Sequence, residues 1–146
     1  MDLNVTLGNL YLGSSSTSSS FTFVPNANET LILNNVNNTA AIINRGGNQT
    51  ISVPVALNSN AAFSSSISNN TILFSNLISG PHNVTTLGPG TVIFTANNTY
   101  AGTTTINTVA TRHLGNGGPT GSTGPNALTN NGTLAFNRSD TSAFAG

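Results

Sequence analysis

Pairs of apolar residues recur along the chain at a step of about ten residues, and polar segments separate them. Most pairs have the pattern apolar–x–apolar, which is typical of a strand with one face in a core. Asn, Ser, Gly and Pro fill the intervals, and these residues favour turns. The pattern predicts alternating strands and turns with almost no helix. The main pairs are Leu10 and Leu12, Phe21 and Phe23, Leu31 and Leu33, Ala41 and Ile43, Ile51 and Val53, Ala61 and Phe63, Ile72 and Phe74, and Val92 and Phe94.

The clearest unit of this pattern lies in residues 88–106. It opens with Gly-Pro-Gly at 88–90, which predicts a tight bend. A strand of alternating polar and apolar residues follows at 91–95, and an Asn-Asn pair ends it. Gly102 then precedes a second β-branched run, which favours another strand. The unit therefore predicts a strand, a polar turn and a second strand.

In their order, these residues resemble the autotransporter-associated β-strand repeat of bacterial passenger domains. The resemblance covers residues 78–146, since 114–118 and 130–140 are similar to segments that follow this repeat. Two positions depart from it: Thr86 stands where many repeats have Lys, and Ala96 where they usually have Gly. The motif positions expected to shape a rung are Gly88, Gly90, Thr91, Asn98, Thr99, Tyr100, Gly102, Thr104 and Ile106.

The resemblance implies a right-handed parallel β-helix, a solenoid of the all-β class with about 20 residues per rung. Residues 1–146 would form a single passenger fragment, truncated at its C-terminal end, with a loop-like insertion at 115–125. The resemblance also implies that the protein is located on the bacterial cell surface or outside the cell. An outer-membrane barrel is expected elsewhere in the parent chain.

The ten-residue step alone is also typical of an up-and-down antiparallel sheet. Regular Asn-Gly hairpin signals are missing, and Asn pairs recur at turns where stacked side chains can form ladders, which favours the solenoid. With two main strands in each coil, about seven rungs are expected. The run 141–146 is expected to begin another strand.

The composition limits which side chains can form the surface of the protein. Charged residues are 4% of the chain, the formal net charge is zero and there is no Cys. The polar surface must be built from Asn, Thr and Ser, and disulfides and thiolate sites are excluded. With three Arg and no Lys, the chain lacks the basic patch that binds nucleic acid. The N-terminus has no signal-peptide pattern, so an export signal is expected outside this sequence.

Candidate catalytic groups are few and scattered. The carboxylates Asp2, Glu29 and Asp140 lie far apart in the sequence, and a glycosidase needs two that face one bond. His82 and His113 have no acidic neighbour at ligand spacing and are expected in turns. We predict no catalytic, cofactor or metal site.

Tyr100 is expected to pack its ring over the rung and keep its hydroxyl in water. Ser122 lacks the surroundings of a serine nucleophile.

The sequence therefore indicates a non-enzymatic surface or secreted passenger fragment that acts as a stalk or adhesin. Its expected partners are host or environmental glycans or proteins, or sister passenger chains, with no nucleic acid. Two alternatives stay open. One is an ice-binding or other ordered-surface solenoid, because strand threonines are frequent. The other is a non-catalytic part of a β-helix enzyme that acts on polysaccharides.

Overall fold

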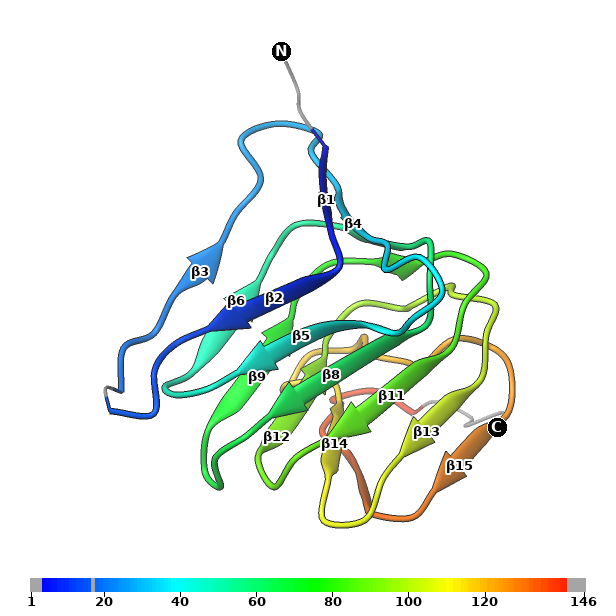
Figure 1. The fold of residues 1–146 in the computed structure, drawn as a ribbon. Helices are drawn as coiled ribbons and strands as arrows, with labels where there is room; N and C mark the ends of the chain where they lie inside the picture. Colours follow the sequence, from blue (N-terminus) through cyan, green and yellow to red (C-terminus); the bar gives the residue numbers. More distant parts are fainter. Residues whose placement is uncertain (1–3, 17, 142–146) are drawn as a thin grey trace.

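The computed structural model describes residues 4–16 and 18–141, which wind into a parallel β-solenoid (Figure 1). In this described part every strand pairing is parallel and there is no helix, so no helical segment is long and apolar enough to cross a membrane. Parallel pairing of strands that are far apart in sequence excludes the antiparallel alternative. The predicted all-β solenoid is confirmed.

The strands form three parallel sheets, and the turns at the C-terminal end contribute to only two of them. The first sheet holds four short strands: β1 (Val5–Leu7), β4 (Leu31–Leu33), β7 (Val55–Leu57) and β10 (Ile78–Ser79). The second sheet holds β2 (Asn9–Leu12), β5 (Ala40–Asn44), β8 (Ala61–Ser65), β11 (Val84–Leu87), β13 (Thr104–Ile106) and β15 (Leu128–Asn130). The third sheet holds β3 (Thr22–Phe23), β6 (Gln49–Ile51), β9 (Thr71–Phe74), β12 (Thr91–Phe94), β14 (Thr111–Leu114) and β16 (Thr133–Phe136).

The length of a turn varies along the solenoid. Thr71 pairs with Thr91 and Thr91 pairs with Thr111, which gives the shortest turns. Asn9 pairs with Ala41, so the turn near the N-terminus is much longer. There are about six turns with a mean spacing of about 23 residues. Seven rungs were expected and about six are found, because the early turns are longer than 20 residues. The early turns also have a third, short strand in the first sheet, whereas the last turns have the two strands expected.

Inward-facing residues of the three sheets form one continuous core. Val92 and Phe94 in β12 are fully buried, as the alternating pattern predicts. In β5 the predicted alternation is one residue out of phase. Ala40 and Ile42 are fully buried there, whereas Ala41 lies on the outer face. Four apolar residues in a row, 40–43, show no alternation from which the inner face could be read.

Three phenylalanines from the second and third sheets pack together in the middle of the core. The ring centroids of Phe63 and Phe74 lie 4.4 Å apart, and those of Phe74 and Phe94 lie 5.5 Å apart, edge to face. Phe74 and Phe94 are partners in adjacent strands of the third sheet, and Phe63 reaches them from the second sheet. Edge-to-face and offset pairs add stabilisation beyond the buried area.

Asparagine side chains join successive turns at the corners of the solenoid. The Asn60 Oδ1 atom accepts a hydrogen bond of 3.1 Å from the Asn83 backbone N–H. Asn83 Oδ1 in turn accepts one of 2.8 Å from the Thr103 N–H. Asn48 makes the same kind of contact to Thr71 N–H at another corner, at 2.9 Å. The Asn-rich turns therefore extend the backbone ladder into the corners, where strands have ended.

The first turn differs from the rest. Most of the exposed large apolar side chains belong to it: Val5, Tyr11, Phe21, Phe23 and Val24. Its strands β1, β2 and β3 each form one edge of the three sheets, at the N-terminal end of the solenoid. An edge strand packs neighbours on one side only, so these side chains contribute less to the core than their equivalents in central turns.

Candidate functional site

The glycines of the predicted repeat lie where a corner passes close to the previous turn. Gly88 follows β11 with φ of +81°, a conformation that other residues rarely adopt. A side chain on Gly90 would overlap the Ser65 hydroxyl and the main-chain oxygens of residues 67 and 70. Gly102 is pressed against the main chain of His82 and Asn83 in the same way. Thr91 begins β12 on its outer face, and Ile106 is fully buried at the end of β13.

Asn98 takes the place of a strand in the first sheet, which ends at β10. Its Oδ1 atom accepts a hydrogen bond of 2.8 Å from the Ile78 N–H of the previous turn. Its Nδ2 group donates one of 2.7 Å to the Ser122 carbonyl of the next turn. The Thr99 N–H also donates to the Ile78 carbonyl, at 3.0 Å. Asn98 thus connects three turns through one buried side chain.

Tyr100 lies wholly inside the solenoid. Its hydroxyl is 2.6 Å from Thr104 Oγ1, and both side chains are buried. The expectation of a hydroxyl in water was wrong, because a buried threonine supplies the hydrogen-bond partner that water would have supplied. That the nine motif residues together set the shape of a rung stays a prediction.

Arg112 is the largest fully buried side chain of the described residues, and it was not predicted from the sequence. Its guanidinium carbon lies 3.6 Å from the centroid of the Phe94 ring, and its Nη2 group donates to Thr86 Oγ1. The Nε and Nη1 groups have no hydrogen-bond partner. Burial lowers the pKa of Arg112 from its usual range to about 10, and the neighbouring Tyr100 partly opposes this.

The inward position of Arg112 follows from the pairing of its strand with the neighbouring strand. Arg112 pairs with Val92, whose side chain points inward, so the alternation of β14 places Arg112 inward too. His113 pairs with Ile93 and lies on the outer face of the same strand. The expectation that His113 lies in a turn was therefore wrong, whereas His82 does lie in the corner between β10 and β11.

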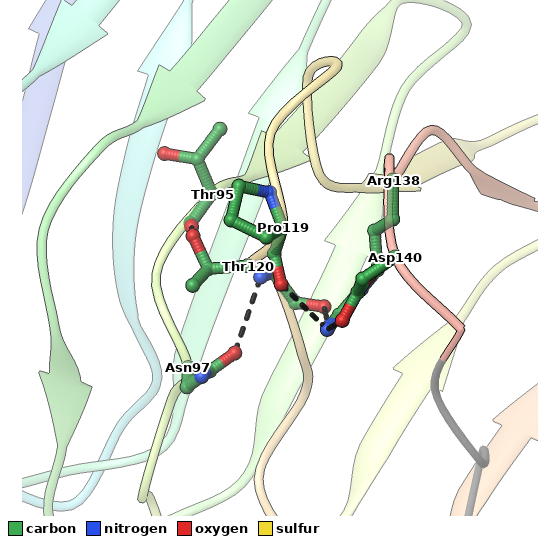
Figure 2. A network of polar contacts seen from close by, with 7 residues as sticks. Thr95, Asn97, Pro119, Thr120, Arg138 and Asp140 are labelled. Carbon is green, nitrogen blue, oxygen red and sulfur yellow. Dashed lines mark hydrogen bonds and ion pairs between the residues drawn. The ribbon is translucent and has the colours of Figure 1, made fainter.

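The segment 115–125 leaves the solenoid and returns to it between β14 and β15 (Figure 2). Residues 119 and 120 are exposed, and Gly121 is buried again. Arg138 donates to the Pro119 carbonyl at 2.8 Å and to the Gly121 carbonyl at 2.7 Å. Thr120 Oγ1 donates to the Thr95 carbonyl at 2.6 Å. Side chains of the neighbouring turns therefore fix this segment in place.

Asp140 forms an ion pair with Arg138 and so orients it toward the segment 115–125. The Nη2 atom of Arg138 lies 2.7 Å from Asp140 Oδ2, and its Nε donates to Oδ1 at 2.8 Å. This hydrogen bonding raises the pKa of Arg138 and lowers that of Asp140. The pair is at the surface, so its contribution to stability is small.

Acidic and imidazole groups do not converge. Glu29 precedes β4 in the first turn and accepts hydrogen bonds from the N–H groups of Asn26 and Ala27. Asp140 follows β16 at the opposite end of the solenoid. Asp2 and the expected strand at 141–146 lie outside the described residues, apart from Thr141. Among residues 4–16 and 18–141, no three potential metal ligands of the His, Cys, Asp or Glu type lie together.

Threonines align in vertical columns on the outer faces. The third sheet brings Thr71, Thr91, Thr111 and Thr133 into register. The second sheet does so with Thr85, Thr105 and Thr129. Beside the first column, the next outward residues of the third sheet are mixed: Leu73, Ile93, His113 and Ala135. The columns are therefore single and do not form a two-dimensional threonine array.

A groove lies over the corners between the first and second sheets. We call it the corner groove; its volume is about 550 Å³ and its lining is almost entirely amide and hydroxyl side chains. The lining residues are Asn34, Asn35, Val36, Asn37, Asn38, Thr39, Asn58, Ser59, Asn60 and His82. The sequence showed these Asn-rich turns, but not that two of them meet beside His82 of a third corner, which depends on the register between turns.

One protein of known character matches part of this sequence. A stretch of 57 residues, 39% of the chain, is 46% identical to the adhesin BmaC autotransporter of Brucella suis biovar 1 (strain 1330). The match spans about 2% of the length of that protein. No family model matches the chain, and no solved structure matches it significantly. The partial match and the parallel β-solenoid fit an autotransporter passenger domain.

Proposed function

We propose that this chain is a segment of a surface-exposed or secreted passenger, in which the solenoid serves as a stalk or as an adhesive surface. The observation that carries the proposal is the 46% identity over 57 residues to an autotransporter adhesin. The parallel solenoid supports it, because stacked turns produce an elongated body with long lateral faces.

A non-enzymatic role accords with the arrangement of reactive groups. The relative is named an adhesin. In the described chain Glu29 and Asp140 occupy opposite ends of the solenoid, whereas two carboxylates that cleave a glycosidic bond lie within about 10 Å of each other. The lateral faces instead offer neutral amides and hydroxyls, which suit glycans, proteins rich in polar groups, or sister chains.

Surface display tests this proposal. The chain is fused to an outer-membrane anchor in a non-adherent bacterium, and attachment of the cells to surfaces coated with glycans, matrix proteins or the purified chain is measured. Cells that display the chain should attach more than cells that carry the anchor alone. If cells that display the chain attach no better than cells with the anchor alone on any of the three surfaces, the adhesive role is contradicted. Only the role of a stalk then remains.

The columns of threonine in register favour one second candidate, an ordered-water or ice-binding surface. Such a surface needs a flat array, and each column here stands beside residues of another kind. Thermal hysteresis of the purified chain tests it. A freezing point equal to the melting point would remove this candidate and leave the adhesive proposal unaffected.

A further inference from the structure

The corner groove owes its form to one enlarged corner. Between β4 and β5 the chain takes six residues, 34–39, whereas the equivalent corners before β8 and β11 take three and four residues, 58–60 and 80–83. The longer corner extends beyond its neighbours, and the groove lies beside the two shorter corners. Val36 at the tip of the loop is 74% exposed.

Hydrogen bonds hold the enlarged corner in one conformation. The Asn35 N–H donates to Ser59 Oγ on the next turn at 3.1 Å, and Asn35 Nδ2 donates to the Thr39 carbonyl at 3.1 Å. The Asn38 N–H donates to the Asn35 carbonyl at 2.8 Å, and Asn37 adopts φ of +63°. A loop fixed in this way loses little conformational freedom when a ligand binds.

Several polar side chains in the groove have hydrogen-bonding capacity left over. The side-chain amides of Asn37, Asn38 and Asn58 form no hydrogen bond within the described part of the chain, and all three residues are exposed. Asn60 uses only its Oδ1 atom, toward Asn83 N–H, and its Nδ2 group is free. Each primary amide offers two donors and an acceptor from one plane.

The groove carries no formal charge. Its lining contains no Asp, Glu, Lys or Arg, and the Arg residues lie elsewhere: Arg45 stacks on Tyr11, Arg112 is buried, and Arg138 pairs with Asp140. Such a lining gives no electrostatic preference for anionic or cationic ligands. Val36 is its only aliphatic side chain, so an apolar ligand would otherwise contact only the carbon atoms of polar side chains.

We propose that the corner groove binds a neutral saccharide, whose adjacent hydroxyl groups donate to and accept from the free asparagine amides. This inference rests on the proposed adhesive function and names its ligand class. A peptide fits less well, because peptides are commonly held by a free strand edge, and β5, β8 and β11 are each paired on both sides.

Binding at a single groove is expected to be weak. The lining has amides but no Trp, Tyr or Phe face for a sugar ring, and hydrogen bonds to a ligand replace hydrogen bonds to water. We expect dissociation constants in the millimolar range. Many copies on one cell would bind a glycan-coated surface far more tightly than one copy does.

Titration of the full chain by nuclear magnetic resonance tests the proposal. Neutral oligosaccharides of several linkages are added to isotope-labelled protein, with a sialylated and a sulfated oligosaccharide as anionic probes and a serine-rich peptide as the other ligand class. We expect saturable shifts of the side-chain amides of Asn38 and Asn58 with at least one neutral sugar. Removal of the anionic group from a probe should not weaken its binding.

A double variant, Asn38→Ala with Asn58→Ala, should lose at least tenfold in affinity. The matched control is Asn116→Ala with Asn131→Ala, two exposed asparagines outside the groove, which should bind as the wild type does. Thermal unfolding of both variants checks that the fold is kept. Three results would overturn the proposal: no saturable shift with any neutral sugar, unchanged affinity in the groove variant, or saturation by the peptide alone.

The same variants separate this inference from the proposed function. If displayed cells attach and the groove variant attaches equally well, the groove proposal fails and the adhesive role stands. If the purified chain binds sugars through the groove but displayed cells do not attach, the adhesive role fails instead.

Discussion

Two neighbouring regions of the core are equally buried, but one is filled by apolar side chains and the other by polar side chains. The central region is apolar and contains Phe63, Phe74 and Phe94, all fully or almost fully buried. The adjoining region toward the C-terminus is equally buried but polar, with Thr86, Tyr100, Thr104 and Arg112 facing one another. Phe94 belongs to both, since Arg112 stacks on its ring. The fold therefore depends on the stacked backbone, and it accepts either kind of interior.

The two regions should differ in what they contribute to stability. Apolar side chains gain free energy from leaving water, whereas polar groups inside a protein must recover the hydrogen bonds that they lose. Tyr100 and Thr104 recover theirs from each other. Arg112 recovers only part, because two of its three guanidinium nitrogens have no partner. The polar region is thus expected to be neutral or costly for stability.

The largest effect should come from the apolar region. Phe74→Ala removes a ring that contacts two others and leaves a cavity, so we expect a loss of about 3–5 kcal/mol in the free energy of unfolding. Urea denaturation followed by circular dichroism measures it. The control is Phe21→Ala in the first turn, where the side chain is 54% exposed and the loss should stay below about 0.5 kcal/mol. Similar losses in both variants would contradict the comparison.

Replacement of the buried cation Arg112 by an apolar residue should instead increase the free energy of unfolding. Arg112→Met keeps an elongated side chain against Phe94 and removes the unpaired N–H groups, so we expect a gain of about 1–3 kcal/mol. Thermal and urea unfolding would show it. Arg45→Met, on the exposed surface, should change stability by less than about 0.5 kcal/mol. A marked loss with Arg112→Met would mean that the cation stabilises the core.

Alkaline pH should narrow the gap between the wild type and Arg112→Met. Burial lowers the pKa of Arg112 to about 10 in the folded chain, so near and above pH 10 the folded chain releases a proton that the unfolded chain, with its higher pKa, still binds. Stability of the wild type relative to the variant therefore rises with pH, by about 1 kcal/mol from pH 9 to 11. Paired urea titrations at the two pH values measure it. A constant difference would show that Arg112 does not titrate in this range.

The smallest effect should come from the buried hydroxyl. Tyr100→Phe leaves Thr104 Oγ1 without its partner at 2.6 Å, and we expect a loss of about 1 kcal/mol. The double variant with Thr104→Val removes both polar groups and should recover most of that loss. Unfolding free energies of the two single variants and the double variant form a thermodynamic cycle. If the losses of the two substitutions simply add, the hydroxyl pair does not interact.

Strands and turns were predictable here because the apolar pairs repeat and Asn or Gly separates them. The resemblance at 88–106 indicated parallel stacking, which the step of about ten residues did not. The short strands of the first sheet, such as β10 with two residues, are too brief to give a period. Arg112 escaped prediction because a charged residue in an alternating strand is normally assigned to the solvent face. The corner groove escaped because its residues meet only through register.

The direction of the hydrogen bonds has a mechanical consequence. Ladder bonds between turns run along the axis of the solenoid, and the asparagine bonds at the corners, such as Asn60 to Asn83, do the same. A pull on the two chain ends therefore loads the terminal turn first and peels it from its neighbour. A detached turn of the length that separates Thr71 from Thr91 releases about 70 Å of extended chain, and the longer turn that separates Asn9 from Ala41 releases about 110 Å. Under tension this protein should lengthen one turn at a time, in unequal steps that are longest near the N-terminus.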